Sequence, residues 1–135
     1  MFLGWPDIAG LTRGRGIPVA DLEARKTTGI GWVPVAQALT PFSTLAANPW
    51  GPIGDIWLLP DPAAGARADL WPDQAPFNLM LCDGINPDGS PWMACLREFL
   101  RRALDELREE FGLSVLSAFE QEFYLDDLTE VPGAN

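Results

Sequence analysis

The sequence predicts an α+β protein in which short strands precede one long amphipathic helix. Thirteen prolines and thirteen glycines are spread unevenly over the 135 residues, and they divide residues 1–92 into short elements. Between Leu96 and Phe111, apolar residues recur at steps of three and four, which is the spacing of a helix with one apolar stripe. The hydrophobic content of 47%, with six tryptophans and seven phenylalanines, is sufficient for a buried core.

Four segments before the helix have the pattern of strands. Phe2–Ile8 and Leu11–Val19 flank an Ala-Gly pair, and we expect them to form a hairpin. Asp55–Leu59 predicts a further strand, which should stop at the proline that follows it. Phe77–Cys82 is a compact apolar run, typical of a buried strand. An aromatic, proline-bearing loop is expected over residues 40–54.

The helix has sequence signals at both ends. Ser90 followed by Pro91 places an N-cap residue and a first-turn proline in the right order, so the helix is expected to begin there. Gly112 is expected to end it as a C-terminal cap. Leu113–Leu125 then predicts a long strand, and the polar residues Asp126–Asn135 are expected to form a frayed end.

The composition excludes several classes of function. The formal net charge of -10 argues against nucleic acid as a partner. The sequence contains no histidine, which excludes a Ser-His-Asp triad or a histidine-ligated zinc within these residues. No apolar run approaches the roughly 20 residues that span a bilayer, and no signal-peptide pattern opens the chain. We therefore expect a soluble, cytoplasmic protein without a membrane partner, in which Cys82 and Cys95 are reduced, buried thiols.

Two glutamates on the last predicted strand form the candidate site. Glu120 and Glu122 alternate onto one face, with their backbones about 6.6–7 Å apart. Two like charges placed in this way need a positive partner, and Mg²⁺ or Mn²⁺ suits carboxylate oxygens. The alternative is an edge strand whose glutamates face water. Two carboxylates do not complete the ligand shells of two metal ions, so further ligands would have to come from elsewhere.

These residues belong to a segment with a family resemblance. Glu120–Leu125 (EQEFYL) resembles the E-x-E-F-[FY]-L strand of the glutamine synthetase family. Other segments match in the order that the family shows, namely Arg13–Pro18 (RGRGIP), Asn48–Pro52 (NPWGP), Leu59–Pro62 (LPDP), Cys82-Asp83 and Asp88–Trp92 (DGSPW). The resemblance covers nearly the whole chain, to about Asp126, and its specificity lies in the order and spacing of these segments.

The resemblance implies a β-grasp N-terminal domain over residues 1–90, followed in residues 91–135 by the beginning of a catalytic domain. It also implies an ATP-dependent carboxylate–amine ligase of nitrogen metabolism, which forms glutamine or a γ-glutamyl amide through an acyl phosphate. Glu120 and Glu122 match the two metal-binding glutamates of the family, one beside the ATP phosphates and the other beside the acceptor carboxylate. Mg²⁺ or Mn²⁺ and ATP are therefore the implied cofactor and cosubstrate.

Two departures from the family pattern bear on this expectation. Arg25 stands where glutamine-forming members have an Asp that helps to bind ammonium, so a γ-glutamyl-amine or polyamine ligase is at least as compatible with the sequence. The basic pair Arg25-Lys26 would either meet an acidic substrate or form a solvated loop. Family members are also several times longer, and the remainder carries other residues of their active site. This chain alone is therefore expected to be inactive.

Oligomeric assembly follows from the same resemblance, because family members form stacked rings with active sites between subunits. The expected partners are the rest of the catalytic domain, neighbouring identical subunits, and a small-molecule carboxylate and amine. Trp50 would either pack between subunits or anchor its loop to its own domain. Arg13 and Arg15, on one strand face, would either join such an interface or face water. The alternative function is a stand-alone, non-catalytic β-grasp interaction module.

Overall fold

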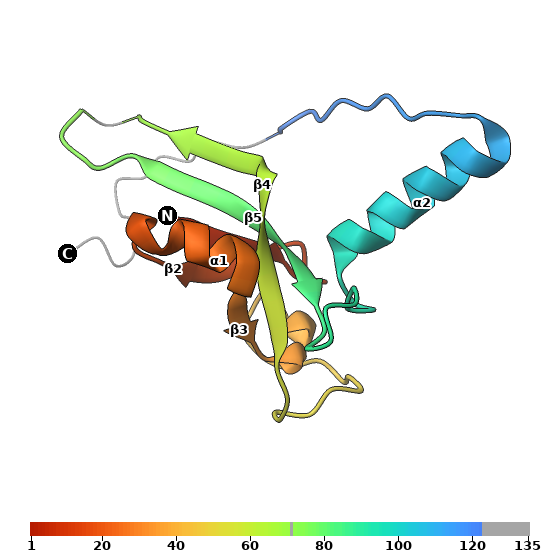
Figure 1. Ribbon diagram of the computed structural model, residues 1–135, viewed down its shortest axis with the longest axis horizontal. Coiled ribbons are helices and arrows are strands. Elements are labelled where there is room, and N and C mark those ends of the chain that lie inside the picture. The colour runs from red at the N-terminus through yellow and green to blue at the C-terminus, as the bar shows by residue number, and fades with distance from the viewer. Residues whose placement is uncertain (71, 123–135) are drawn as a thin grey trace.

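The computed structural model describes residues 1–70 and 72–122, which are built on one five-stranded sheet (Figure 1). The strands are β1 (Phe2–Pro6), β2 (Thr12–Gly16), β3 (Ile30–Trp32), β4 (Ile56–Ala68) and β5 (Phe77–Ile85). Their order is β2-β1-β5-β4-β3, with β1 and β5 parallel and the other neighbours antiparallel. The helices are α1 (Leu22–Thr28), α2 (Leu96–Phe111) and the short 3-10 helices η1 (Val19–Asp21) and η2 (Pro34–Ala38). This arrangement confirms the predicted α+β class and β-grasp-like architecture.

The predicted N-terminal hairpin is confirmed, and it supplies the centre of the core. β1 and β2 pair along their whole length, and Gly10 turns the chain between them with φ of 78°. Leu3 and Trp5 point to the same face of β1 because side chains alternate along a strand. Both are buried, and they lie in a cluster with Ile30, Ile56, Leu58, Met80, Cys82, Trp92 and Cys95.

The prediction that a strand stops at Pro60 is wrong. β4 continues to Ala68, with a shift in its pairing to β5 between Pro60 and Gly65. The short strand β3 pairs with β4 only as far as Leu58, so the described part of β4 beyond it has a neighbour on one side alone. Proline is tolerated at such an open edge and at a bulge, because no ladder hydrogen bond is lost there.

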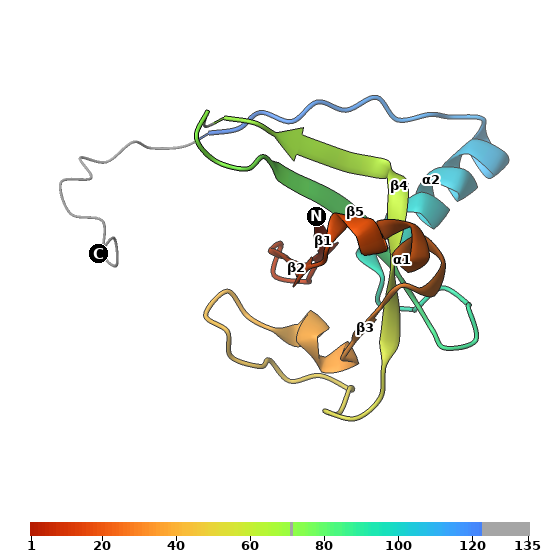
Figure 2. The same cartoon turned by 60° about the vertical axis from the view of Figure 1, so that its left-hand side comes forward.

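The two α-helices relate to the sheet in different ways. α1 lies across β4, as both views show (Figure 1, Figure 2). Gly29 ends α1 with φ of 66°, and a Cβ atom there would lie 2.9 Å from the carbonyl oxygen of Leu58. α2 extends away from the end of β5 (Figure 1), and none of its residues is buried. No helix in the described ranges is long and apolar enough to cross a membrane.

The predicted start of the long helix is wrong, whereas its predicted end is confirmed. α2 begins at Leu96, because the N–H and hydroxyl groups of Ser90 both bond to Asp88 in a turn, at 2.9 and 2.6 Å. The residues between this turn and α2 carry Trp92 into the core. Gly112 closes α2 in the left-handed region with φ of 65°.

The strand predicted over Leu113–Leu125 is not formed in its described part. Residues 112–122 have no regular secondary structure and are exposed. A strand is stabilised by a ladder with a neighbour, and the described strands pair only with one another. Residues 123–125, like the predicted frayed end Asp126–Asn135, lie outside the described residues.

Candidate functional site

Glu120 and Glu122 lie in the segment that follows α2, and both side chains are exposed. Because this segment forms no strand, strand alternation does not fix the two carboxylates on one face. In the described ranges, no group of three or more acidic, cysteine or histidine side chains is arranged to hold a metal ion. The two glutamates stay candidate ligands predicted from the sequence, and the described part of the chain brings no third ligand to them.

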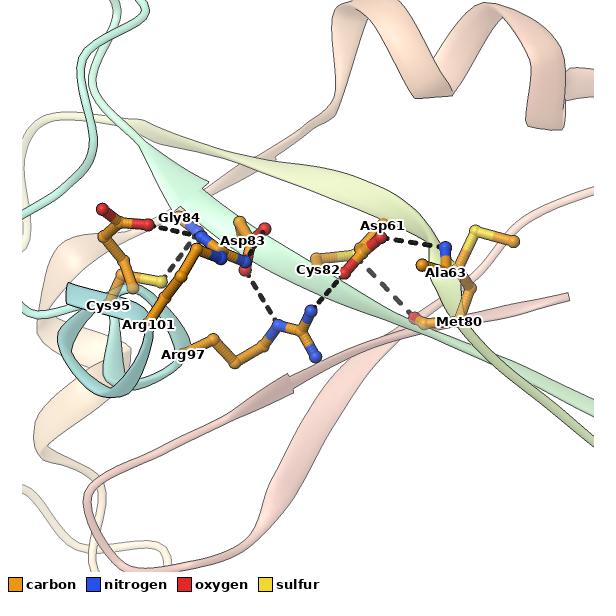
Figure 3. Close-up of polar contacts among 10 residues, drawn as sticks. Asp61, Ala63, Met80, Cys82, Asp83, Gly84, Cys95, Arg97 and Arg101 are labelled. Carbon is orange, nitrogen blue, oxygen red and sulfur yellow. Dashed lines mark hydrogen bonds and ion pairs between the residues drawn. The ribbon is translucent and has the colours of Figure 1, made fainter. Parts of the chain in front are cut away.

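An ion-pair network joins α2 to the sheet (Figure 3). Arg97 donates from Nε to Asp83 of β5 at 2.8 Å and from Nη2 to Asp61 of β4. Arg101 donates to the other carboxylate oxygen of Asp83 at 2.9 Å, and also to Glu98. The hydrogen bond to Asp83 raises the pKa of Arg101, so this side chain keeps its charge. Two carboxylates on neighbouring strands are thus tied to one helix.

The sequence interpretation missed this network. Asp61 and Asp83 were notable only as parts of family-like segments, and neither was predicted to pair. The signal that could have found the helix side of the network is the spacing of Arg97 and Arg101, which puts both guanidinium groups on one helix face. The partners were not foreseeable, because Asp61 is brought beside Asp83 by the pairing of β4 with β5.

Two buried cysteines lie beside the network (Figure 3). Both are free thiols, which confirms their prediction as reduced and buried. Cys95 Sγ accepts a hydrogen bond from the backbone N–H of Gly84 at 3.3 Å. Burial, with a smaller contribution from Asp83, raises the pKa of Cys82 to about 12. Cys82 is therefore a neutral thiol at pH 7 and a poor nucleophile.

The basic pair Arg25-Lys26 lies in the last turn of α1 and not in a loop. Lys26 forms an ion pair with Glu23 at 2.6 Å, which compensates its charge on the same helix. Arg25 donates to the carbonyl oxygen of Gly29 at 3.4 Å, a group without formal charge. Both side chains are half-buried. The hydrogen bond to Gly29 therefore does not compensate the charge of Arg25, in contrast to the ion pair of Lys26.

Arg13 and Arg15 have different environments although they share a strand. Arg13 pairs through Nε with Asp7, whose fully buried carboxylate also accepts the N–H of Leu11 at 2.9 Å. Arg15 is exposed. The interpretation as solvent-facing arginines therefore fails for Arg13, which neutralises a buried charge. Both arginines line a cavity of about 390 Å³ together with Trp32 and Asp55.

Trp50 anchors its loop to its own domain. Its ring centroid lies 5.3 Å from that of Trp92, which in turn lies 5.9 Å from that of Trp5. Gln37 was not predicted as a core residue, yet it is fully buried. It accepts a hydrogen bond from Trp5 Nε1 and donates one to the carbonyl oxygen of Ala94 at 3.0 Å. These contacts connect η2, β1 and the residues before α2.

Comparison with known proteins finds a family profile and relatives that match most of the chain. A family profile for the glutamine synthetase N-terminal domain matches residues 2–92. A gamma-glutamylpolyamine synthetase of Streptomyces coelicolor is 32% identical over 123 residues, which make up 90% of this chain and 26% of that protein. Type-1 glutamine synthetase 1 of Dictyostelium discoideum is 51% identical over 35 residues, 26% of this chain and 7% of that protein. The chain thus spans about a quarter of the length of the Streptomyces relative.

Solved structures agree with these matches. The crystal structure of a novel glutamine synthase homolog superposes with a TM-score of 0.75 at 38% sequence identity, covering 81% of this chain and 26% of that one. GmaS in its complex with ADP gives a TM-score of 0.62 at 19% identity, covering 81% of this chain and 23% of that one, which supports the fold alone. The family profile matches most residues of the chain, and the similarity to the Streptomyces relative extends over nearly all of them. The chain therefore belongs to the glutamine synthetase family.

Proposed function

We propose that this chain is the N-terminal portion of an ATP-dependent carboxylate–amine ligase, with the β-grasp domain in residues 1–90 and the beginning of the catalytic domain in residues 91–135. The observation that carries the proposal is the similarity to the gamma-glutamylpolyamine synthetase, which extends over 90% of the chain. That similarity covers more residues than the N-terminal profile, which ends at Trp92, so it includes part of the proposed catalytic domain.

The exposed face of α2 supports a larger catalytic domain. Phe99, Leu100 and Phe111 are 63%, 58% and 67% exposed, and Leu116 and Phe119 in the segment after α2 are 100% and 86% exposed. An apolar stripe of this kind is normally covered by another surface. We propose that the remainder of the ligase covers it, since this chain spans 26% of the Streptomyces relative. The chain alone would then lack most of the active site and be inactive as a ligase.

Glu120 and Glu122 are the proposed ligands for Mg²⁺ or Mn²⁺. Their chemistry fits these ions, because carboxylate oxygens are the donors that such ions prefer and both side chains are open to solvent. A bound metal ion would neutralise charge on the phosphate oxygens during phosphoryl transfer from ATP. The glutamates themselves would bind and orient the metal ion, and the rest of the ligase would supply further ligands.

The proposed acceptor is a small-molecule carboxylate, and the proposed nitrogen donor is an amine other than ammonia. Two observations support this choice of amine. The Streptomyces relative is a gamma-glutamylpolyamine synthetase. By the family resemblance, Arg25 stands where glutamine-forming members have an Asp that helps to bind ammonium, so the chain lacks that ammonium ligand. Neighbouring identical subunits are the proposed partners in the assembled enzyme.

The test is an assay of phosphate release from ATP by the native protein that carries this sequence, with Mg²⁺ or Mn²⁺, glutamate, and ammonia, a monoamine or a polyamine. We expect release that depends on the amine and is greater with a monoamine or polyamine than with ammonia. The double variant Glu120→Gln/Glu122→Gln should abolish it, whereas Glu109→Gln/Glu110→Gln, on the exposed surface of α2, should not. A rate of phosphate release that is the same with and without each amine would contradict the ligase assignment.

A further inference from the structure

We propose that Arg97 and Arg101 are positioning residues, whose pairing with Asp61 and Asp83 sets the direction in which α2 leaves the sheet. This direction also sets where the segment with Glu120 and Glu122 begins. The importance of the network for a metal site rests on the proposed function. The geometry itself concerns only residues that the structure describes.

The apolar stripe of α2 does not hold the helix against the sheet. A surface helix usually turns its apolar stripe toward the core. In α2 no residue is buried, and Phe99, Leu100 and Phe111 are all more than half exposed. The helix projects from the end of β5 with its later turns away from the sheet (Figure 1). Its orientation must therefore depend on other contacts, and these lie near its N-terminal end.

The contacts just before α2 fix its starting point but not its direction. Gln37 donates to the carbonyl oxygen of Ala94 at 3.0 Å, and Cys95 Sγ accepts from Gly84 at 3.3 Å. Both contacts involve residues that precede Leu96, the first residue of the helix. A helix held only at its first residue can pivot about that point, because backbone rotation there changes the direction of its axis.

The guanidinium groups supply the missing restraint (Figure 3). Arg97 pairs through Nε with Asp83 of β5 and through Nη2 with Asp61 of β4. The three side chains are only 20–24% exposed. A planar guanidinium group is specific for orientation, and half-buried ion pairs are screened less by salt than surface pairs. Arg101, one turn later, reaches the second oxygen of Asp83. Two successive turns of α2 are thereby tied to the sheet, which defines the direction of its axis.

The charges explain why this restraint depends on Arg97. The network contains the carboxylates of Asp61, Asp83 and Glu98 against the two guanidinium groups. Without Arg97, Asp61 loses its ion-pair partner and keeps only the hydrogen bond from the backbone N–H of Ala63, so two half-buried carboxylates on adjacent strands repel each other. A lysine at the same position has a single ammonium group, which does not reproduce the fork between the two strands.

The test measures the distance between spin labels on cysteines introduced at Ala24 of α1 and Glu109 of α2, two exposed positions, in the 135-residue chain. Cys82 and Cys95 are buried, and the mass of the labelled protein verifies that they stay unlabelled. We expect one narrow distance distribution in the parent protein. The distribution should become broad in Arg97→Met and in Asp61→Asn/Asp83→Asn, while circular dichroism shows an unchanged helix content. Arg97→Lys should recover the narrow distribution only in part.

Arg108→Met is the matched control, since Arg108 pairs with Asp105 of the same helix at 3.3 Å. It should keep the parent distribution. The proposal is overturned if Arg97→Met, or the aspartate double variant where Arg97→Met does not fold, keeps the narrow distribution as well. The outcome is independent of ligase activity, so a failure of the proposed function would show in the phosphate assay and not in this distance.

Discussion

The indole ring of Trp5 occupies the space that a side chain at Gly84 of β5 would fill. A Cβ atom at Gly84 would lie 2.4 Å from Cη2 and 2.7 Å from Cζ3 of that ring. The ring has no room to retreat, because Trp5 is 1% exposed and its Nε1–H is bonded to the buried amide of Gln37. The absence of a side chain at Gly84 is therefore a condition for packing the sheet against the residues that lead into α2.

Gly84→Ala is expected to lower the free energy of unfolding by about 3 kcal/mol, since the added methyl group overpacks a closed site. Urea or guanidinium unfolding measures the change. Gly16→Ala is the matched control, because Gly16 also lies in a strand and a Cβ atom added to it would meet no heavy atom within 4 Å. The control should change stability by less than about 1 kcal/mol. Equal stability of the two variants would show that Gly84 and Trp5 are not in contact.

Gln37→Met is expected to cost about 3 kcal/mol, because it leaves the indole N–H of Trp5 and the carbonyl oxygen of Ala94 buried without partners. Equilibrium unfolding gives the cost, and near-ultraviolet circular dichroism should report the altered surroundings of Trp5. Gln74→Met, at an exposed position, should leave both measurements unchanged. A stable Gln37→Met variant with the parent spectrum would refute the assigned hydrogen bonds.

Arg13→Met is expected to be far more destabilising than Arg15→Met. The first change leaves the carboxylate of Asp7, which is fully buried, without its ion-pair partner and should cost about 3 kcal/mol. The second removes an exposed charge from the same strand and should cost no more than about 0.5 kcal/mol. Thermal or urea unfolding distinguishes them. The double variant Asp7→Asn/Arg13→Met should recover part of the loss, because no buried charge then remains.

Stability should fall in alkaline solution because of Cys82. Its pKa in the folded protein is raised from the ordinary value of 9.0 to about 12. Between these values the unfolded chain releases the thiol proton and the folded protein keeps it, so unfolding becomes more favourable as the pH rises. The slope approaches about 1.4 kcal/mol per pH unit.

Urea unfolding at pH 8, 9 and 10 under reducing conditions measures this slope. Cys82→Ala is the control, since it lacks the thiol and retains every other group that titrates in the same range. Its stability should fall less steeply with pH than that of the parent protein. Parallel pH dependences of the two proteins would mean that Cys82 is not protonated beyond its ordinary range.

Local sequence signals predicted the elements whose determinants lie within a few residues. The hairpin of β1 and β2 follows from the Ala9-Gly10 turn, and the end of α2 follows from Gly112. The start of the long helix was wrongly predicted at Ser90, because the Ser90 side chain has two possible local partners, the helix N-terminus and Asp88. The turn with Asp88 prevails, since Trp92 must first reach the core.

Long-range features could be predicted less well. The continuation of β4 past Pro60 depends on how short β3 is, and this is a property of pairing between distant segments. The pairing of Arg97 with Asp61 spans 36 residues and needs the register of β4 and β5. Glu120 and Glu122 were predicted as metal ligands from strand alternation and family resemblance, but the described residues place no third ligand beside them.

The most direct test of the central claim is the intact mass of the native protein that carries this sequence, isolated from its source cells. The account predicts a mass several times the 14.8 kDa of this chain, because the ligase proposal requires the remainder of a catalytic domain. A native mass near 14.8 kDa would contradict the ligase proposal and favour a β-grasp interaction module without catalysis.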